Sequence, residues 1–82
     1  MSDAEVEIGE DVEIAVLLDE NGNPLGAVVD DLIVATGVEG SIVDETIDIF
    51  DADGNLVLED ETVSVYDADG QLLISEETIT EA

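Results

Sequence analysis

A sixteen-residue phrase, repeated in tandem in the second half of the chain, constrains the fold more than any other feature. Residues 45–60 read ETIDIFDADGNLVLED, residues 61–76 read ETVSVYDADGQLLISE, and a third start follows at residues 77–79. In each unit Asp-Ala-Asp-Gly separates two runs of β-prone residues, and Gly54 and Gly70 stand where a hairpin loop needs a positive φ. Each unit is therefore predicted to be a β-hairpin.

The phase of the hydrophobic residues predicts a further turn between the two units. A single strand over residues 55–66 would place Leu58 and Val63 on opposite faces, because side chains alternate along a strand. We therefore predict a turn at residues 59–62. The two hairpins then form a four-stranded meander, with residues 78–80 as a short edge strand.

The first half of the chain carries a weaker echo of the same design. Residues 12–18 alternate as a strand, residues 19–23 are rich in turn formers, and residues 25–29 are predicted to return as the partner strand. Residues 31–35 are predicted to be another strand. Residues 36–41 are the best candidate for a loop.

These patterns predict an all-β fold: a small antiparallel sandwich or an open barrel of six to eight short strands, with a C-terminal meander of tandem hairpins. The length predicts a single domain over residues 1–82. Its N-terminal strands and loop would occupy residues 4–44, and the two hairpin repeats with the short edge strand would occupy residues 45–80.

The charge of the chain is entirely one-sided. It has twenty-four Asp and Glu residues and no Lys, Arg or His, which gives a formal net charge of -24 at pH 7. No side-chain salt bridge can form, and the repulsion between carboxylates should weaken the fold in dilute buffer. Molar salt shortens the Debye length to about 3 Å and screens that repulsion. Hydrophobic residues still make up 45% of the chain, which excludes a disordered acidic tail.

This composition resembles that of proteins from halophilic archaea that fill their cytoplasm with potassium chloride, although it departs from them in having no Arg at all. The resemblance implies a high-salt environment. A designed β protein made without basic residues is the alternative explanation. Because Cys and His are also missing, disulfides are excluded and a metal would have to bind through oxygen ligands.

No targeting or membrane segment is expected. The residues after Met1 include neither the basic region nor the apolar region of a secretory signal. The longest nearly uncharged stretch, residues 32–38, is far shorter than the roughly 20 residues that a membrane span requires. We therefore expect a soluble protein.

The two Asp-Ala-Asp-Gly loops are the sharpest candidates for a binding site. They resemble fragments of calcium-binding loops, and Asp51, Asp53, Asp67 and Asp69 are the candidate ligands for weak binding of Ca²⁺ or a monovalent cation. The chain has aliphatic residues where an EF-hand has its first ligand. Turn formation explains the same aspartates, because their side chains bond nearby backbone amides. We favour the turn interpretation and expect no dedicated cofactor.

Catalysis and direct binding of nucleic acid are not expected. Adjacent acids occur at residues 30–31, 44–45 and 76–77, but a chain so rich in acids has such pairs by density alone. A catalytic carboxyl group would also need a pocket and a raised pKa. No side chain can neutralise the phosphates of a nucleic acid. Mimicry of DNA, in which carboxylates imitate phosphates, remains a less favoured alternative.

Phe50 and Tyr66, the only aromatic residues, take equivalent places in the two repeats beside Val57 and Leu73. We expect these four interface candidates on the face opposite the aliphatic core. There they either close a second small core or form an apolar patch for another subunit. Association would supply the burial that so small a domain lacks.

The stretches IFDADGNLV and VYDADGQLL resemble hairpins of virion decoration, fibre and tail proteins. Together with the acidic composition, this resemblance implies a structural protein, most specifically a capsid decoration (cement) protein of a virus of halophilic archaea. We expect a homo-oligomer, with a trimer as the first choice, that binds a capsid or other shell protein through strand edges and its apolar patch. Its location would be the virion, assembled in a high-salt cytoplasm. A cytoplasmic interaction module of a halophile is the alternative.

Overall fold

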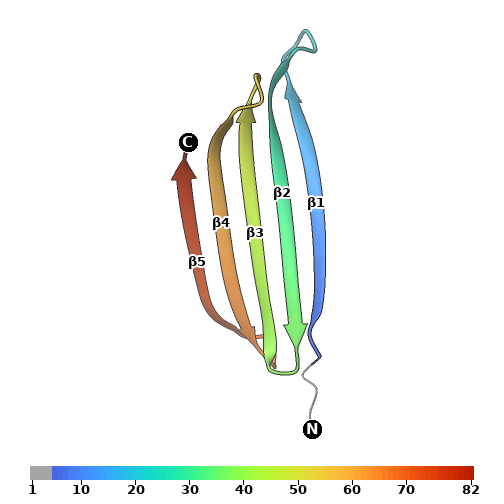
Figure 1. The fold of residues 1–82 in the computed structure, drawn as a ribbon, viewed down its shortest axis with the longest axis vertical. Helices are drawn as coiled ribbons and strands as arrows, with labels where there is room; N and C mark the ends of the chain where they lie inside the picture. The colour runs from blue at the N-terminus through green and yellow to red at the C-terminus, as the bar shows by residue number, and fades with distance from the viewer. Residues whose placement is uncertain (1–4) are drawn as a thin grey trace.

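The computed structural model describes residues 5–82, which form five antiparallel strands (Figure 1). Their order in the sheet follows the chain, so each connection is a hairpin. The all-β class and the meander of hairpins are thereby confirmed. Residues 1–4, where the predicted domain begins, lie outside the described residues. The strands are β1 (Glu7–Leu18), β2 (Pro24–Gly37), β3 (Gly40–Asp51), β4 (Leu56–Asp67) and β5 (Leu72–Glu81).

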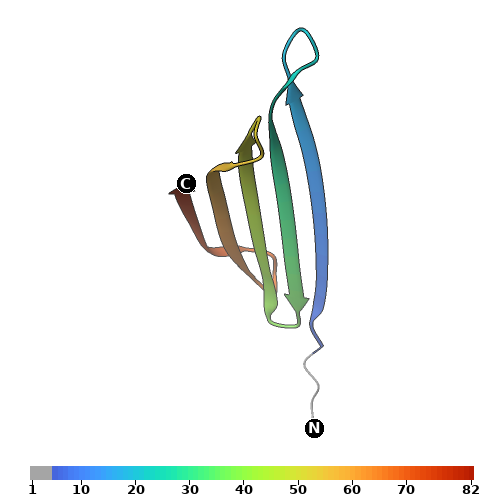
Figure 2. The same cartoon turned by 45° about the horizontal axis from the view of Figure 1, so that its top comes forward.

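The five strands lie in one open, twisted layer, and neither view of residues 5–82 shows another element over either face (Figure 1, Figure 2). The molecule is elongated, with extents of 59 × 20 × 19 Å. We expected six to eight short strands in a sandwich or open barrel. The structure instead has five strands of 10 to 14 residues, because two of the expected interruptions do not occur.

The predicted turn at residues 59–62 is wrong, since these residues lie inside β4. The phase change that suggested the turn is real: Leu58 pairs with Ile49 and Val63 pairs with Asp44, so the two aliphatic side chains lie on opposite faces. The strand continues through the change because both faces of this sheet are mixed. No single aliphatic face has to be preserved along β4.

The first half of the chain shows the same continuity. Residues 25–29 and 31–35, predicted as separate strands, both belong to β2. The predicted loop at residues 36–41 shrinks to a turn at Val38 and Glu39, because the residues on either side of it pair within the β2–β3 ladder. β2 is therefore one continuous strand that pairs with β1 along the whole length of β1.

The other three hairpin connections share one turn geometry. Gly54 and Gly70 both have a φ of +85°, as the repeat predicts, and Gly22 in the first half has a φ of +84°. The N–H of each glycine donates to the carbonyl of the aspartate three positions earlier, at 3.0 or 3.1 Å. The echo in the first half is thus a third copy of the same turn.

Each of these three turns is followed by a shift in register. Leu25, Val57 and Leu73 have no partner in the preceding strand, which marks them as the extra residues of β-bulges. Between the turn and the bulge, Leu56 pairs with Phe50 in one hairpin, and Leu72 pairs with Tyr66 in the next. The bulges therefore redirect the start of each returning strand.

The described residues lack a hydrophobic core. No hydrophobic side chain in residues 5–82 is buried. β1 and β5 are exposed along their whole length, while most residues of the three central strands are half-buried by their neighbours. A sheet normally buries one face against a second layer, and this part of the chain supplies none.

Candidate association surface

The turns themselves occupy two of the predicted cation ligands, Asp51 and Asp67. Oδ1 of Asp51 accepts hydrogen bonds from the N–H groups of Asp53 and Asn55, each at 2.9 Å. Oδ1 of Asp67 accepts the corresponding two bonds in its own turn. These bonds, that from Asn55 foremost, hold the pKa of Asp51 below its ordinary value. A cation would have to share this oxygen with the backbone.

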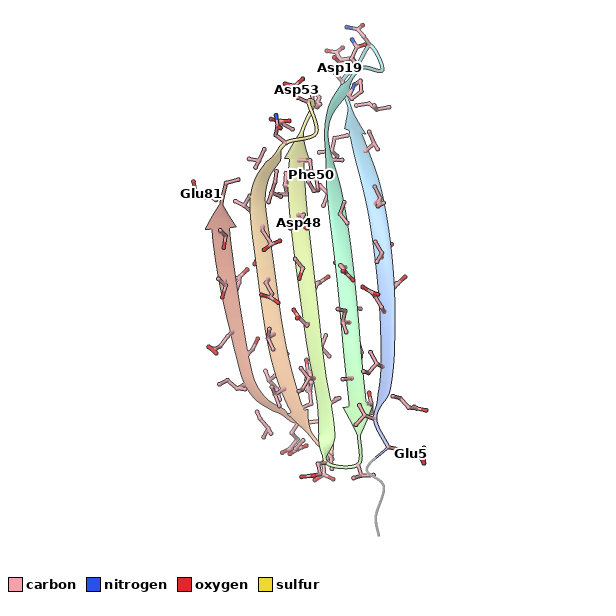
Figure 3. All side chains as sticks on the ribbon, viewed as in Figure 1. Glu5, Asp19, Asp48, Phe50, Asp53 and Glu81 are labelled. Carbon is pink, nitrogen blue, oxygen red and sulfur yellow. The ribbon has the colours of Figure 1, made fainter. Side chains whose placement is uncertain are left out.

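The four predicted ligands fall into two separate pairs. Asp51 and Asp53 lie at the β3–β4 turn, where Figure 3 labels Asp53, and Asp67 and Asp69 lie at the β4–β5 turn at the other end of the sheet. Within residues 5–82, no group of three or more acidic side chains is arranged to hold a metal ion. Weak binding of Ca²⁺ or a monovalent cation stays a prediction.

The four predicted interface residues also divide into two pairs. Phe50 and Val57 flank the β3–β4 turn, whereas Tyr66 and Leu73 flank the β4–β5 turn. We had expected the two rings to lie on the same face of the sheet, but they lie on opposite faces. Tyr66 pairs with Ser41, which lies an odd number of positions from Phe50 in β3. The sixteen-residue repeat has the length of one strand and one turn. Equivalent residues of the two copies therefore lie on neighbouring strands that run in opposite directions, with their side chains on opposite faces.

The bulges give Val57 and Leu73 a third counterpart, Leu25, that the sequence analysis missed. These side chains are 46%, 63% and 59% exposed, respectively. Leu25 could have been found from its place two residues after Asn23, which matches the spacing of the other two turns. All three aliphatic side chains are available for contact with another molecule.

An acidic belt crosses the middle of all five strands. It includes the adjacent acids that the high density of acidic residues had seemed to explain. Each strand contributes four consecutive residues, which we call a tetrad, and the first two residues of every tetrad are acidic. The register sets the first residue of a tetrad opposite the fourth residue of the next, and the second opposite the third. An acid in the belt therefore faces an uncharged residue, with the pair Glu13 and Asp30 as the exception. The tetrads are residues 10–13 (EDVE), 30–33 (DDLI), 44–47 (DETI), 60–63 (DETV) and 76–79 (EETI).

The acids of the belt meet diagonally, the first acid of one tetrad with the second acid of the next. A hydrogen bond between the two carboxyl groups of such a pair requires a proton on one of them. This bond is the largest cause, ahead of charge repulsion, of the raised pKa of the glutamate in each contact. Asp48 and Glu59, which are directly opposite, make a fifth contact of this kind beside the tetrads. The diagonal contacts are Glu10 with Asp31, Asp30 with Glu45, Asp44 with Glu61, and Asp60 with Glu77.

The aspartates of these five contacts share a second property. Each has a buried Oδ1 atom without a hydrogen-bond partner; they are Asp30, Asp31, Asp44, Asp48 and Asp60. A buried carboxylate oxygen without a partner is unfavourable when the group is ionised. The belt therefore weakens the sheet at neutral pH.

The two outer strands expose most of the large apolar side chains. Ten of the seventeen that are exposed lie in β1 or β5. Within the described sheet, neither strand has a neighbour on its outer side. Alternate N–H and C=O groups along these edges therefore lack a partner in the ladder, which makes them templates for another strand. In β1 the exposed residues are Ile8, Val12, Ile14, Val16, Leu17 and Leu18, and in β5 they are Leu72, Leu73, Ile74 and Ile79.

A shallow pocket of about 330 Å³ lies beside the β2–β3 turn. Its lining is mainly apolar and includes Val38, Ile42 and Val65 together with two of the predicted interface residues, Tyr66 and Leu73. Val38, at the tip of the turn, is 78% exposed. The pocket is at the small end of the range for ligand sites, so it adds mainly to the apolar surface available for association.

No protein-family model matches the chain, and comparisons with curated proteins and with solved structures found no match. Within residues 5–82, no helix has the length and apolar character needed to cross a membrane.

Proposed function

We propose that this chain is a structural assembly protein, whose sheet is completed by association with other protein surfaces. One observation carries the proposal: no hydrophobic side chain in residues 5–82 is buried. A chain that is 45% hydrophobic gains less from folding when none of the hydrophobic side chains in that range is fully removed from water. Association supplies the missing burial and, by mass action, stabilises the folded state.

The form of the sheet supports the same role. Both outer strands have free edges of ten or twelve residues, and most of the exposed aliphatic residues lie on them. Proteins that function as monomers usually protect such edges with short strands, bulges or inward-pointing charges. Here most charges of the two edge strands lie in the central belt, and one end of each strand, residues 14–18 of β1 and 72–74 of β5, is entirely apolar.

The more specific role is decoration of a virion shell in a high-salt host. It rests on the acidic composition and on the resemblance of the two Asp-Ala-Asp-Gly hairpins to those of virion decoration, fibre and tail proteins. In this role the chain forms a homo-oligomer, with a trimer as the first choice, and binds a shell protein.

Sedimentation and circular dichroism over a series of potassium chloride concentrations test the assembly role. We expect a folded oligomer in molar salt, because screening permits chains with a charge of -24 to approach one another. Dilution in low salt should dissociate and unfold it together. A folded monomer at every salt and protein concentration would contradict the proposal.

A further inference from the structure

One pairing rule operates at all four junctions between strands. The first residue of a tetrad lies opposite the fourth residue of the next, as Asp44 lies opposite Val63 and Asp60 opposite Ile79. Because paired residues share a face and the fourth residue is three positions from the first, the tetrad changes face from each strand to the next. Each strand is thus related to the next by three changes. It runs in the opposite direction, its equivalent tetrad residues lie on the other face, and it is displaced by one strand spacing across the sheet.

This relation is open-ended, and β5 ends with its outer side ready to continue it. Residues 76–79 repeat the pattern of two acids, Thr and an aliphatic residue that β3 presents to β4 and β4 presents to β5. A strand that continues the rule must carry a tetrad and have a free edge. In this chain β1 meets both conditions, with residues 10–13 as its tetrad.

We propose that β5 of one copy pairs with β1 of a second copy, so that the sheet continues from copy to copy. The inference rests on the proposed assembly role and identifies the partner as this chain itself. The rule sets residues 72–81 against residues 8–17 of the second copy, so all ten residues of β5 find a partner. The second copy is turned over relative to the first.

The composition of β5 fits this pairing, because β5 offers β1 the same kinds of residues that β2 already offers it. In both cases the β1 tetrad faces two acids, an uncharged residue and Ile. The only like charges placed directly opposite are Glu76 and Glu13 of the second copy, and the fold already tolerates Asp30 opposite Glu13. Within the tetrads, Glu77, Thr78 and Ile79 face Val12, Asp11 and Glu10 of the second copy, where β2 sets Asp31, Leu32 and Ile33.

Beyond the tetrad the same register brings apolar residues together. Ile74 comes to lie opposite Ala15 of the second copy, and residues 72–73 lie opposite residues 16–17. Leu72 and Ile74 are 56% and 55% exposed in the single sheet. Pairing would give both outer strands the half-buried surroundings that the central strands already have.

A two-fold pairing of β5 with β5 cannot follow the rule. In an antiparallel ladder, the two residues of a hydrogen-bonded pair both point their backbone groups at each other, and only alternate residues point outward. In a two-fold contact both partners of a pair come from β5, and both must point their backbone groups the same way. Each residue is therefore paired with one that is an even number of positions away in the sequence of β5. The first and fourth residues are three positions apart, so the contact is heterologous and generates an open fibre or a closed ring.

Engineered cysteines test the register, because the chain has none of its own. Ala15→Cys and Ile74→Cys are made as separate proteins, mixed in molar potassium chloride and oxidised; Ile14→Cys and Ser75→Cys form a second mixture. Two mixtures are needed because neighbouring pairs alternate between hydrogen-bonded and non-hydrogen-bonded geometry. Within one copy, β1 and β5 are four strand spacings apart, about 19 Å, which is too far for a disulfide.

We expect at least one mixture to form heterodimeric disulfides about tenfold faster than either of its variants alone, because paired edges hold the thiols at a high effective concentration. A slipped pair, Leu17→Cys with Ile74→Cys, should cross-link no faster than unpaired thiols. Circular dichroism of each variant checks that the strands form.

The other outcomes overturn the inference. Fast disulfide formation by Ile74→Cys or Ser75→Cys alone would show a two-fold β5 contact, and equal rates for the slipped pair would show random encounter. If sedimentation shows oligomers without cross-links in either mixture, another surface associates: the assembly role stands and the β5–β1 contact is wrong. A folded monomer in all conditions would reject both.

Discussion

One carboxylate oxygen in each of the three long turns accepts two backbone hydrogen bonds, and this is the clearest role of any single residue in the chain. For Asp19 the donors are the N–H groups of Asn21 and Asn23, both at 2.9 Å. The repeat predicted such turn chemistry, together with the positive φ of Gly54 and Gly70. It did not predict the bulges, because a register shift depends on the strand beside the turn as well as on the turn.

Replacing a turn aspartate separates its structural role from its charge. Asp67→Ala removes the acceptor of two hydrogen bonds and should lower the free energy of unfolding by about 1 kcal/mol, measured by urea titration in molar salt. Asp69→Ala removes an equal charge from the same turn, although the Asp69 carboxylate accepts none of the turn's hydrogen bonds. Equal effects of the two substitutions would mean that charge alone matters.

At the scale of elements, the sequence predicted the hairpins but not the length of the strands. The interruption predicted at residues 59–62 assumed that one face of the sheet would be aliphatic, as in a sandwich. A strand in a single layer with two mixed faces needs no such consistency, so Leu58 and Val63 can face opposite ways. The belt escaped prediction because adjacent acids become a pattern only when the register of all five strands is known.

Proline distinguishes a strand from a turn in β4. Thr62→Pro should destabilise the fold by about 3 kcal/mol, because residue 62 lies within a central strand and loses its N–H. Ala68→Pro is the matched control, because residue 68 follows the first residue of the β4–β5 turn and its N–H makes none of the turn's hydrogen bonds. This control should be neutral or stabilising by up to about 1 kcal/mol. Tolerance of Thr62→Pro would restore the turn at residues 59–62.

At the scale of the whole molecule, both the one-sided charge and the single layer limit stability. Packing is limited to neighbours within one layer, since no hydrophobic side chain in residues 5–82 is buried. The carboxyl contacts of the belt add a dependence on protons. Bonded carboxyl groups raise the pKa of five glutamates above the ordinary value of 4.5: Glu10, Glu45, Glu59, Glu61 and Glu77.

The pH dependence of stability follows from the direction of these shifts. A glutamate with a raised pKa binds protons more readily in the folded chain, so its contribution is complete below pH 4.5 and is lost as the pH rises through the folded pKa. For Asp19 and Asp51, backbone hydrogen bonds lower the pKa below 3.8, and their contribution is lost as the pH falls below that value. The urea midpoint should therefore rise from pH 7 to pH 4.5 and fall again in stronger acid.

Glu61→Gln should flatten this pH profile, because it removes one carboxyl group with a raised pKa from the belt. Glu39→Gln in the β2–β3 turn removes an equal charge outside the belt and serves as the control for net charge. The measurement requires dilute protein, since the sequence pI of about 4.1 lies in the same range and favours precipitation. A midpoint that falls steadily as the pH is lowered from 7 would show that the carboxyl contacts do not bind protons in the folded chain.

Each strand contacts only the strands next to it in sequence, so the sheet is modular in the way of a repeat protein. Duplication or deletion of one sixteen-residue unit would change its width by one strand and leave the remaining ladders intact. Such a change would also move the exit of the chain from one end of the long axis to the other. With five strands, β1 begins toward one end of the long axis and β5 ends toward the other (Figure 1). Whether the number of strands is odd or even therefore decides at which end a domain fused after the last strand would lie.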